Sequence, residues 1–202
     1  MFNEKLTKQL SSALSENGFQ QPTAIQTKAL PKINGGLDLI VVGPPACGKS
    51  STILIGAIQK LKNAFEDAPR ALIIVPDETS ALAMLEKFKW MSCYTDLRAE
   101  VVFESGKIIK QTEAIYFGTD IVIGTAKRIM EIYLKKNLNI TKIKLLAFDD
   151  AETLVKQNVQ SLLERLSLSL PKCQHLLFTN ELNTKVEKLA DKFLVSPLLI
   201  EG

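Results

Sequence analysis

The amino-acid sequence predicts a doubly wound α/β fold, with a mostly parallel sheet and helices on both of its faces. Seven short runs rich in Leu, Ile and Val recur along the chain, and most of them are apolar at consecutive positions. Strands that are buried on both faces have this pattern. Amphipathic segments with apolar residues at helical spacing lie between the runs, and this alternation of strand and helix is typical of a parallel sheet.

The elements can be placed in order along the chain. We expect strands at 37–42, 71–75, 99–103, 120–124, 144–148, 175–178 and 197–200, and helices over 51–65 and 79–91. Right-handed crossovers would bring the loops that follow the strands to one edge of the sheet, where ligands bind. We expect one domain over 1–202, with an N-terminal segment of 1–36 and a core of 37–202.

Composition limits the class of protein. The 202 residues are 46% hydrophobic, enough for one core, and the net charge of +3 permits contact with nucleic acid without indicating it. Cys47, Cys93 and Cys173 lack the spacing of a zinc site or a disulfide framework, which favours a reducing compartment. The N-terminus has no apolar signal core, and no run approaches the roughly 18 apolar residues of a membrane span. We therefore expect a cytoplasmic protein without a membrane partner.

Residues 43–50, GPPACGKS, match a phosphate-binding loop and follow the first expected strand. Backbone N–H groups of such a loop surround phosphates, while Lys49 would contact the β- and γ-phosphates and the Ser50 hydroxyl would bind Mg²⁺. The residues expected to hold the nucleotide here are Gly43, Pro44, Pro45, Ala46, Cys47, Gly48, Lys49, Ser50 and Ser51. A chance glycine turn is the alternative, but the expected strand before the loop and helix after it favour nucleotide binding.

The segment NGFQQPTAIQ at 17–26 lies upstream of this loop. Its residues alone indicate a helix C-cap at Gly18, an exposed aromatic and a new helix after Pro22-Thr23. The segment resembles the Q motif of the DEAD-box RNA helicases. The resemblance implies that the amide of Gln26 hydrogen-bonds adenine and that the ring of Phe19 stacks on it; simple packing is the alternative for Phe19. Phe2 looks like the isolated aromatic that precedes this motif in the family.

The resemblance extends over nearly the whole chain and implies the first RecA-like domain of the family. GTAKR at 124–128 is similar to the Thr-Pro-Gly-Arg element, and DDAE at 149–152 falls where Asp-Glu-Ala-Asp is expected. It implies that Asp149 holds Mg²⁺ and that Asp150, with Lys49, acts in catalysis. It also implies a nucleic-acid surface that contains Gly106, Thr125, Lys127 and Arg128.

Several positions depart from the family pattern. Asp150 is one methylene shorter than the family glutamate that orients the attacking water. Glu152 replaces the aspartate that is tied to Ser-Ala-Thr, which here reads Thr179-Asn180-Glu181. Glu152 and Glu181 could then lie near each other, where their like charges would repel unless one of them is protonated. Alanine replaces glycine at Ala46, which would cost about 1 kcal/mol if φ there is positive.

The expected nucleic-acid surface departs as well. Glu78 stands where the family has an RNA-contacting arginine, and Ser105-Gly106 replaces a pair of glycines. Trp90 and His175 have apolar neighbours and are expected in or near the core.

Two hypotheses about function remain. The first is the ATP-binding domain of an ATP-dependent RNA helicase, which uses ATP and Mg²⁺, binds RNA weakly alone and needs a second RecA-like domain, in cis or in trans, for efficient hydrolysis. The second is a catalytically degenerate nucleotide-binding interaction module. A P-loop kinase or unrelated ATPase is a third, weaker possibility, because the Q-like segment and the acidic motif fit helicases jointly.

Overall fold

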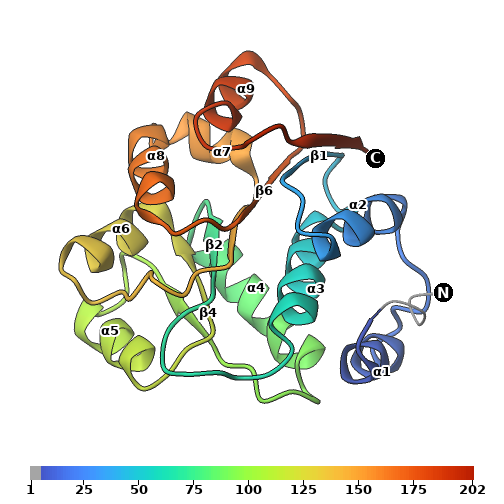
Figure 1. The fold of residues 1–202 in the computed structure, drawn as a ribbon, viewed down its shortest axis with the longest axis horizontal. Helices are drawn as coiled ribbons and strands as arrows, with labels where there is room; N and C mark the ends of the chain where they lie inside the picture. Colours follow the sequence, from blue (N-terminus) through green and yellow to red (C-terminus); the bar gives the residue numbers. More distant parts are fainter. Residues whose placement is uncertain (1–5) are drawn as a thin grey trace.

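The computed structural model describes residues 6–202, which contain one seven-stranded sheet with helices on both faces (Figure 1). The strand order is β3-β4-β2-β5-β6-β1-β7, and every neighbouring pair is parallel. This arrangement confirms the predicted doubly wound α/β class. Because all seven strands are parallel, the loops that follow them lie at one edge of the sheet, the carboxyl edge.

The strands agree with the runs that predicted them to within two residues at each end. Their bounds are β1 Leu39–Val42, β2 Ala71–Val75, β3 Ala99–Val102, β4 Ile121–Thr125, β5 Leu145–Phe148, β6 Gln174–Thr179 and β7 Leu198–Glu201. The helices are α1 Lys8–Glu16, α2 Ala24–Asn34, α3 Lys49–Leu61, α4 Glu78–Met91, α5 Ile108–Tyr116, α6 Ala126–Leu134, α7 Ala151–Lys156, α8 Gln160–Ser169 and α9 Thr184–Ala190. The helix predicted over 51–65 therefore starts two residues earlier and ends at Leu61, and Lys62 beyond it has a φ of +65°.

Two apolar clusters lie on the two faces of the sheet. One cluster joins side chains of α1, α2, α3 and α4 to the sheet, and the other joins side chains of α5 to α9 to the opposite face. Along β2, Ile73 belongs to the first cluster while Leu72 and Ile74 belong to the second. Successive side chains of a strand point to opposite faces, so a sheet covered on both sides needs apolar residues at consecutive positions.

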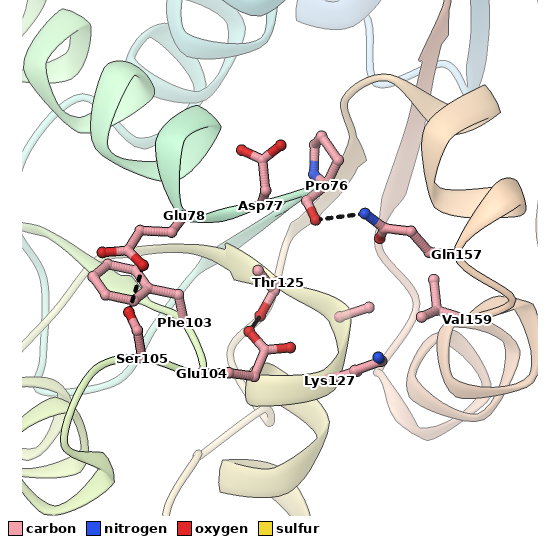
Figure 2. A pocket seen from close by; sticks show the side chains of 11 residues that line it. Pro76, Asp77, Glu78, Phe103, Glu104, Ser105, Thr125, Lys127, Gln157 and Val159 are labelled. Carbon is pink, nitrogen blue, oxygen red and sulfur yellow. Dashed lines mark hydrogen bonds between the residues drawn. The ribbon is translucent and has the colours of Figure 1, made fainter.

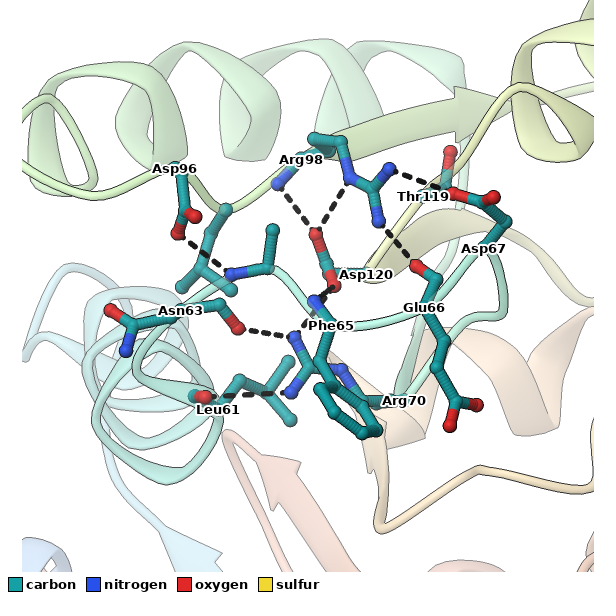
Figure 3. A network of polar contacts seen from close by, with 12 residues as sticks. Leu61, Asn63, Phe65, Glu66, Asp67, Arg70, Asp96, Arg98, Thr119 and Asp120 are labelled. Carbon is teal, nitrogen blue, oxygen red and sulfur yellow. Dashed lines mark hydrogen bonds and ion pairs between the residues drawn. The ribbon is translucent and has the colours of Figure 1, made fainter.

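A charged network closes the amino edge of the sheet beneath β2, β3 and β4 (Figure 3). The fully buried carboxylate of Asp120 accepts hydrogen bonds from Arg70 Nη2 at 2.6 Å and from Arg98 Nε at 3.0 Å. Burial alone would raise the pKa of Asp120, but the hydrogen bonds from the two arginines outweigh it and hold that pKa below its ordinary value. The network joins the loop before β2 to the starts of β3 and β4.

We expect Asp120→Asn to destabilise the protein by about 3 kcal/mol, because it leaves the buried guanidinium of Arg70 without its counter-charge. Urea denaturation at pH 7 measures the change. The difference from wild type should shrink below about pH 4, since a carboxylate with a lowered pKa loses its stabilising effect as it is protonated. Asp67→Asn is the control: Asp67 is mostly exposed and pairs with Arg98, so its loss should cost less than about 0.5 kcal/mol. Equal effects of the two substitutions would contradict this account.

Candidate functional site

The loop after β1 has the backbone shape of a phosphate-binding loop. Gly48 has a φ of +100° and Ala46 a φ of +63°, both in the left-handed region. A Cβ at Gly43 would lie 2.3 Å from Ile25 Cδ1 and 2.9 Å from Cys47 Sγ, so a larger residue there would require both side chains to shift. The sequence predicted a cost for alanine at position 46 if φ there is positive. Since φ is positive, Ala46 is strained.

Lys49 spans the loop from the first turn of α3. Its ammonium donates to the backbone oxygens of Gly43 at 2.7 Å and Pro44 at 2.9 Å, and to Asn180 Oδ1 at 2.7 Å. The side chain is largely buried, so its charge is directed into the loop instead of the solvent. Cys47 belongs to the same loop, and its sulfur lies 3.8 Å from this ammonium.

Ser50 in the first turn of α3 lies beside Asp149, which directly follows β5. Ser50 Oγ donates to Asp149 Oδ2 at 2.6 Å, and Asp149 is 4% exposed. Within residues 6–202, Asp149 Oδ1 has no hydrogen-bond partner. Burial raises the pKa of Asp149 to about 6, although the hydrogen bond from Ser50 opposes the shift. A hydroxyl beside a carboxylate oxygen with no partner is a donor set that suits Mg²⁺, so these two residues fit the expected ion.

The acidic motif continues into α7. Asp150 precedes the helix with a φ of +51°, and burial and the charge of Glu152 raise its pKa. Glu152 is buried and accepts hydrogen bonds from Thr179 Oγ1 at 2.7 Å, from the Asn180 backbone N–H at 3.2 Å and from Asn180 Nδ2. The glutamate therefore connects α7 to the end of β6.

The carboxylates of Glu152 and Glu181 have different hydrogen-bond partners. The carboxylate of Glu152 is satisfied by donors from residues 179 and 180, whereas the side chain of Glu181 is exposed and accepts from Asn183. The cause is the direction of the chain after β6: the backbone carbonyl of Glu181, not its side chain, lies 2.8 Å from Thr179 Oγ1.

Gln26 lies in the first turn of α2 and is held by a capping box. Its Oε1 accepts from the Thr23 N–H at 2.9 Å, and its own N–H donates to Thr23 Oγ1 at 3.3 Å. This leaves Gln26 Nε2 buried without a hydrogen-bond partner in the described part of the chain. Phe19 packs on Trp90, with ring centroids 5.0 Å apart, and both rings are half-buried. Phe19 thus has a packing role, and stacking on adenine stays a prediction.

These groups surround one pocket of about 470 Å³. It is lined by Phe19, Thr23, Gln26, Pro45, Ala46, Gly48, Lys49, Ser50, Ser51, Lys87, Asp150 and Asn180. Nine of these residues were predicted from the sequence. Thr23 was missed although the Thr-x-x-Gln spacing of a capping box signals it. Lys87 was also missed, because nothing in its helix marks it. Phe2 lies outside the described residues.

The residues expected to contact nucleic acid lie beside a second pocket of about 400 Å³ at the ends of β2, β3 and β4 (Figure 2). Thr125 and Lys127 line it. Arg128 does not: its buried guanidinium donates to the backbone oxygen of Glu104 at 2.7 Å and to Gln111 Oε1 at 3.2 Å. At Gly106 the Cβ of any other residue would lie 2.1 Å from Gln111 Nε2, so the Gln111 side chain would have to move. Phosphate contact by Arg128 stays a prediction, and it would require its present bonds to break.

His175 and Trp90 lie near the core. Each is partly buried, and His175 Nε2 is 2.9 Å from Ser167 Oγ. Across residues 6–202, no helix has both the length and the apolar character needed to cross a membrane.

A parallel sheet with a phosphate-binding loop after its first strand, and an acidic strand end beside that loop, defines a RecA-like P-loop domain. The family model of the DEAD/DEAH box helicases matches residues 23–189, and the chain belongs to this family.

Similar proteins agree with this assignment. The ATP-dependent RNA helicase DBP10 of Candida glabrata is 29% identical over 197 residues, which are 96% of this chain and 20% of that protein. DBP10 of Saccharomyces cerevisiae is 27% identical, with the same two coverages. The chain therefore spans about a fifth of the length of these relatives.

Solved structures share the fold. A crystal structure of a DEAD box protein from the hyperthermophile Methanococcus jannaschii has a TM-score of 0.94 and 24% identity, over 99% of this chain and 55% of that one. A structure of a Saccharomyces cerevisiae Dbp5 variant bound to Nup159, a Gle1 variant, IP6 and ADP has a TM-score of 0.85 and 22% identity, over 98% of this chain and 52% of that one.

We expect Ala46→Gly to stabilise the protein by about 0.5 kcal/mol. Relief of a left-handed alanine gains about 1–2 kcal/mol, and the greater freedom of the unfolded chain offsets about 0.4–1 kcal/mol of it. Urea denaturation measures the change. Ala83→Gly, at an exposed position inside α4, is the matched control and should destabilise by about 1 kcal/mol. Destabilisation by both substitutions would show that the loop does not strain Ala46.

Proposed function

We propose that this chain acts as the first RecA-like domain of an ATP-dependent RNA helicase. In this proposal it binds Mg-ATP in the pocket around Lys49 and the backbone of single-stranded RNA beside Thr125. The observation that carries the proposal is the convergence of Lys49, Gln26 and Ser50, which is hydrogen-bonded to Asp149, on one pocket. The relatives are named ATP-dependent RNA helicases, and the Dbp5 structure was determined with ADP.

The unpaired amide nitrogen of Gln26 supports a preference for adenine. Its buried N–H groups need an acceptor, and the ring nitrogens of a purine are acceptors. The Oε1 atom has a second lone pair besides the one that Thr23 uses, so the amide still offers both a donor and an acceptor. This combination suits adenine, whose edge carries an amino donor beside a ring nitrogen acceptor.

Lys49, Ser50 and Asp149 support binding of the triphosphate with Mg²⁺. The ammonium of Lys49 is already directed into the loop, and the phosphates would replace the backbone oxygens as its partners. Mg²⁺ would neutralise charge on the phosphate oxygens when bound, and Ser50 and Asp149 would hold it.

Efficient hydrolysis is proposed to need a second RecA-like domain. An arginine finger on the γ-phosphate is worth about 10³–10⁵ in rate, and in the family the second domain supplies it. Asp150 is the group of this chain that would orient water. Because its side chain is short, its carboxylate would lie farther from the nucleotide than that of a glutamate. We further propose a cytoplasmic place of action.

The alternative, a degenerate nucleotide-binding interaction module, has its own support. Asp150 and Glu78 depart from the family at positions that serve chemistry and RNA contact, and Glu78 brings a negative charge to the proposed RNA surface. Glu152 does not support this alternative, because it still joins α7 to the end of β6.

We expect the chain to bind Mg-ATP more tightly than Mg-GTP by at least about tenfold, as measured by titration calorimetry. Lys49→Ala should weaken binding by about 10- to 100-fold, the range for loss of a hydrogen bond to a charged group. Gln26→Ala should reduce the preference for adenine while the affinity for triphosphate persists. Lys188→Ala, an exposed lysine of α9, is the charge-matched control and should change nothing. No uptake of Mg-ATP, or equal binding of GTP, would refute the proposal.

We expect the 202-residue chain to release phosphate from ATP very slowly, with or without RNA. Asp150→Glu should raise the residual single-turnover rate by about tenfold or more, since a misplacement of about 1 Å costs on the order of a hundredfold in rate. Asp150→Asn, which cannot accept a proton, should abolish the residual rate and serves as the negative control. If Asp150→Glu and wild type are equally fast at ordinary helicase rates, the shorter side chain is no handicap.

A further inference from the structure

Two hydroxyl donors of the proposed RNA surface are already taken by the protein's own carboxylates. Thr125 Oγ1, at the end of β4, donates its single proton to Glu104 Oε2 at 2.6 Å (Figure 2). A phosphate oxygen is only an acceptor, so it can bond this hydroxyl only if Glu104 leaves.

Ser105 and Glu78 form a second such pair. The hydroxyl of Ser105, in the loop after β3, donates to the carboxylate of Glu78 in the first turn of α4. The contact joins two segments 27 residues apart in sequence, and it lies on the same pocket as the Thr125–Glu104 pair.

The guanidinium of Arg128 is hydrogen-bonded to the loop that carries Glu104. Its Nη2 donates to the backbone oxygen of Glu104, its Nη1 to Gln111, and its Nε lies 3.3 Å from Glu131 Oε2. The side chain is 7% exposed. The guanidinium that could bind a phosphate therefore supports the loop that carries Glu104.

The charge of the pocket adds to this effect. Asp77, Glu78 and Glu104 line it, against one ammonium, that of Lys127, among the lining residues within 6–202. Carboxylates near a phosphate repel it, and a pair at a protein surface interacts strongly enough to change affinity severalfold.

Resting on the proposed function, we propose that Glu78 and Glu104 set the affinity of this domain for single-stranded RNA by occupying the hydroxyls of Ser105 and Thr125. RNA must displace both carboxylates before its phosphates can bond those hydroxyls. The wild-type chain thus binds RNA weakly, and loss of either carboxylate exposes a donor and removes a repulsive charge.

Fluorescence anisotropy of a labelled ten-nucleotide oligouridylate, with Mg²⁺ and a non-hydrolysable ATP analogue at low salt, tests the proposal. Both carboxylates are at or near the surface, and thermal melts verify that the variants are folded. Glu104→Gln removes only the charge and should tighten binding about threefold. Glu104→Ala also frees the Thr125 hydroxyl and should tighten it about tenfold, as should Glu78→Ala.

Two variants control for charge and for the hydroxyl. Glu113→Ala removes an exposed carboxylate from the pocket beside Tyr116 at the amino edge of the sheet, and should change affinity less than twofold. Adding Thr125→Val to Glu104→Ala should abolish the part of the gain that exceeds that of Glu104→Gln, since the freed donor is then missing.

The outcomes separate this inference from the proposed function. If wild type binds RNA and the variants at Glu78 and Glu104 bind no more tightly than Glu113→Ala, the inference is overturned and the proposed function stands. If no variant binds RNA at all, proposed RNA binding fails, and the inference fails with it. A third outcome is that an octa-arginine peptide binds wild type, that Glu104→Ala abolishes this binding, and that the affinity for RNA does not increase. The pocket then serves a basic protein partner, and the inference is overturned.

Discussion

The parallel pairing of β1 with β6 and of β6 with β5 is the constraint on which the rest of the structure depends. It places Val42 beside Thr179 and Phe148 beside Leu177, so the residues that follow these strands meet at one edge. Parallel strands end on the same side of the sheet. The phosphate-binding loop, the acidic motif and the segment after β6 therefore meet at one site although they are far apart in sequence. The Ser50–Asp149 and Glu152–Thr179 hydrogen bonds are consequences of this register.

The buried aspartates at the two edges of the sheet differ in how fully their carboxylates are paired. At the amino edge, Asp120 has two arginine partners and accepts further backbone N–H groups, so its buried charge is compensated. At the carboxyl edge, Asp149 Oδ1 and Gln26 Nε2 are buried without partners among the described residues, and Ala46 and Asp150 have positive φ values. Uncompensated groups and backbone strain in one place are typical of sites that a ligand completes.

The departures from the family pattern differ in their structural consequences. Glu152 is longer than the aspartate it replaces, yet it still reaches Thr179 and Asn180. Asp150 is shorter than the glutamate it replaces and has no such compensation. Glu78, which stands where the family has an arginine, engages the hydroxyl of Ser105 beside the proposed RNA surface. Glu104 engages the hydroxyl of Thr125 in the same pocket.

The sequence by itself determined the sheet, the two covered faces and the phosphate-binding loop. These depend on local periodicity and on a short motif whose backbone shape follows from its glycines, so neighbouring residues carry the information. It also indicated that alanine at position 46 would be strained if φ there is positive.

Only the tertiary structure decided how side chains distant in sequence are paired. Arg128 turns inward because the loop before α5 offers it acceptors, Glu152 avoids Glu181 because the chain turns after β6, and Lys87 reaches the pocket from the middle of α4. Such contacts depend on the packing of whole helices against the sheet, and a side chain with several possible partners bonds to whichever one the fold brings within reach.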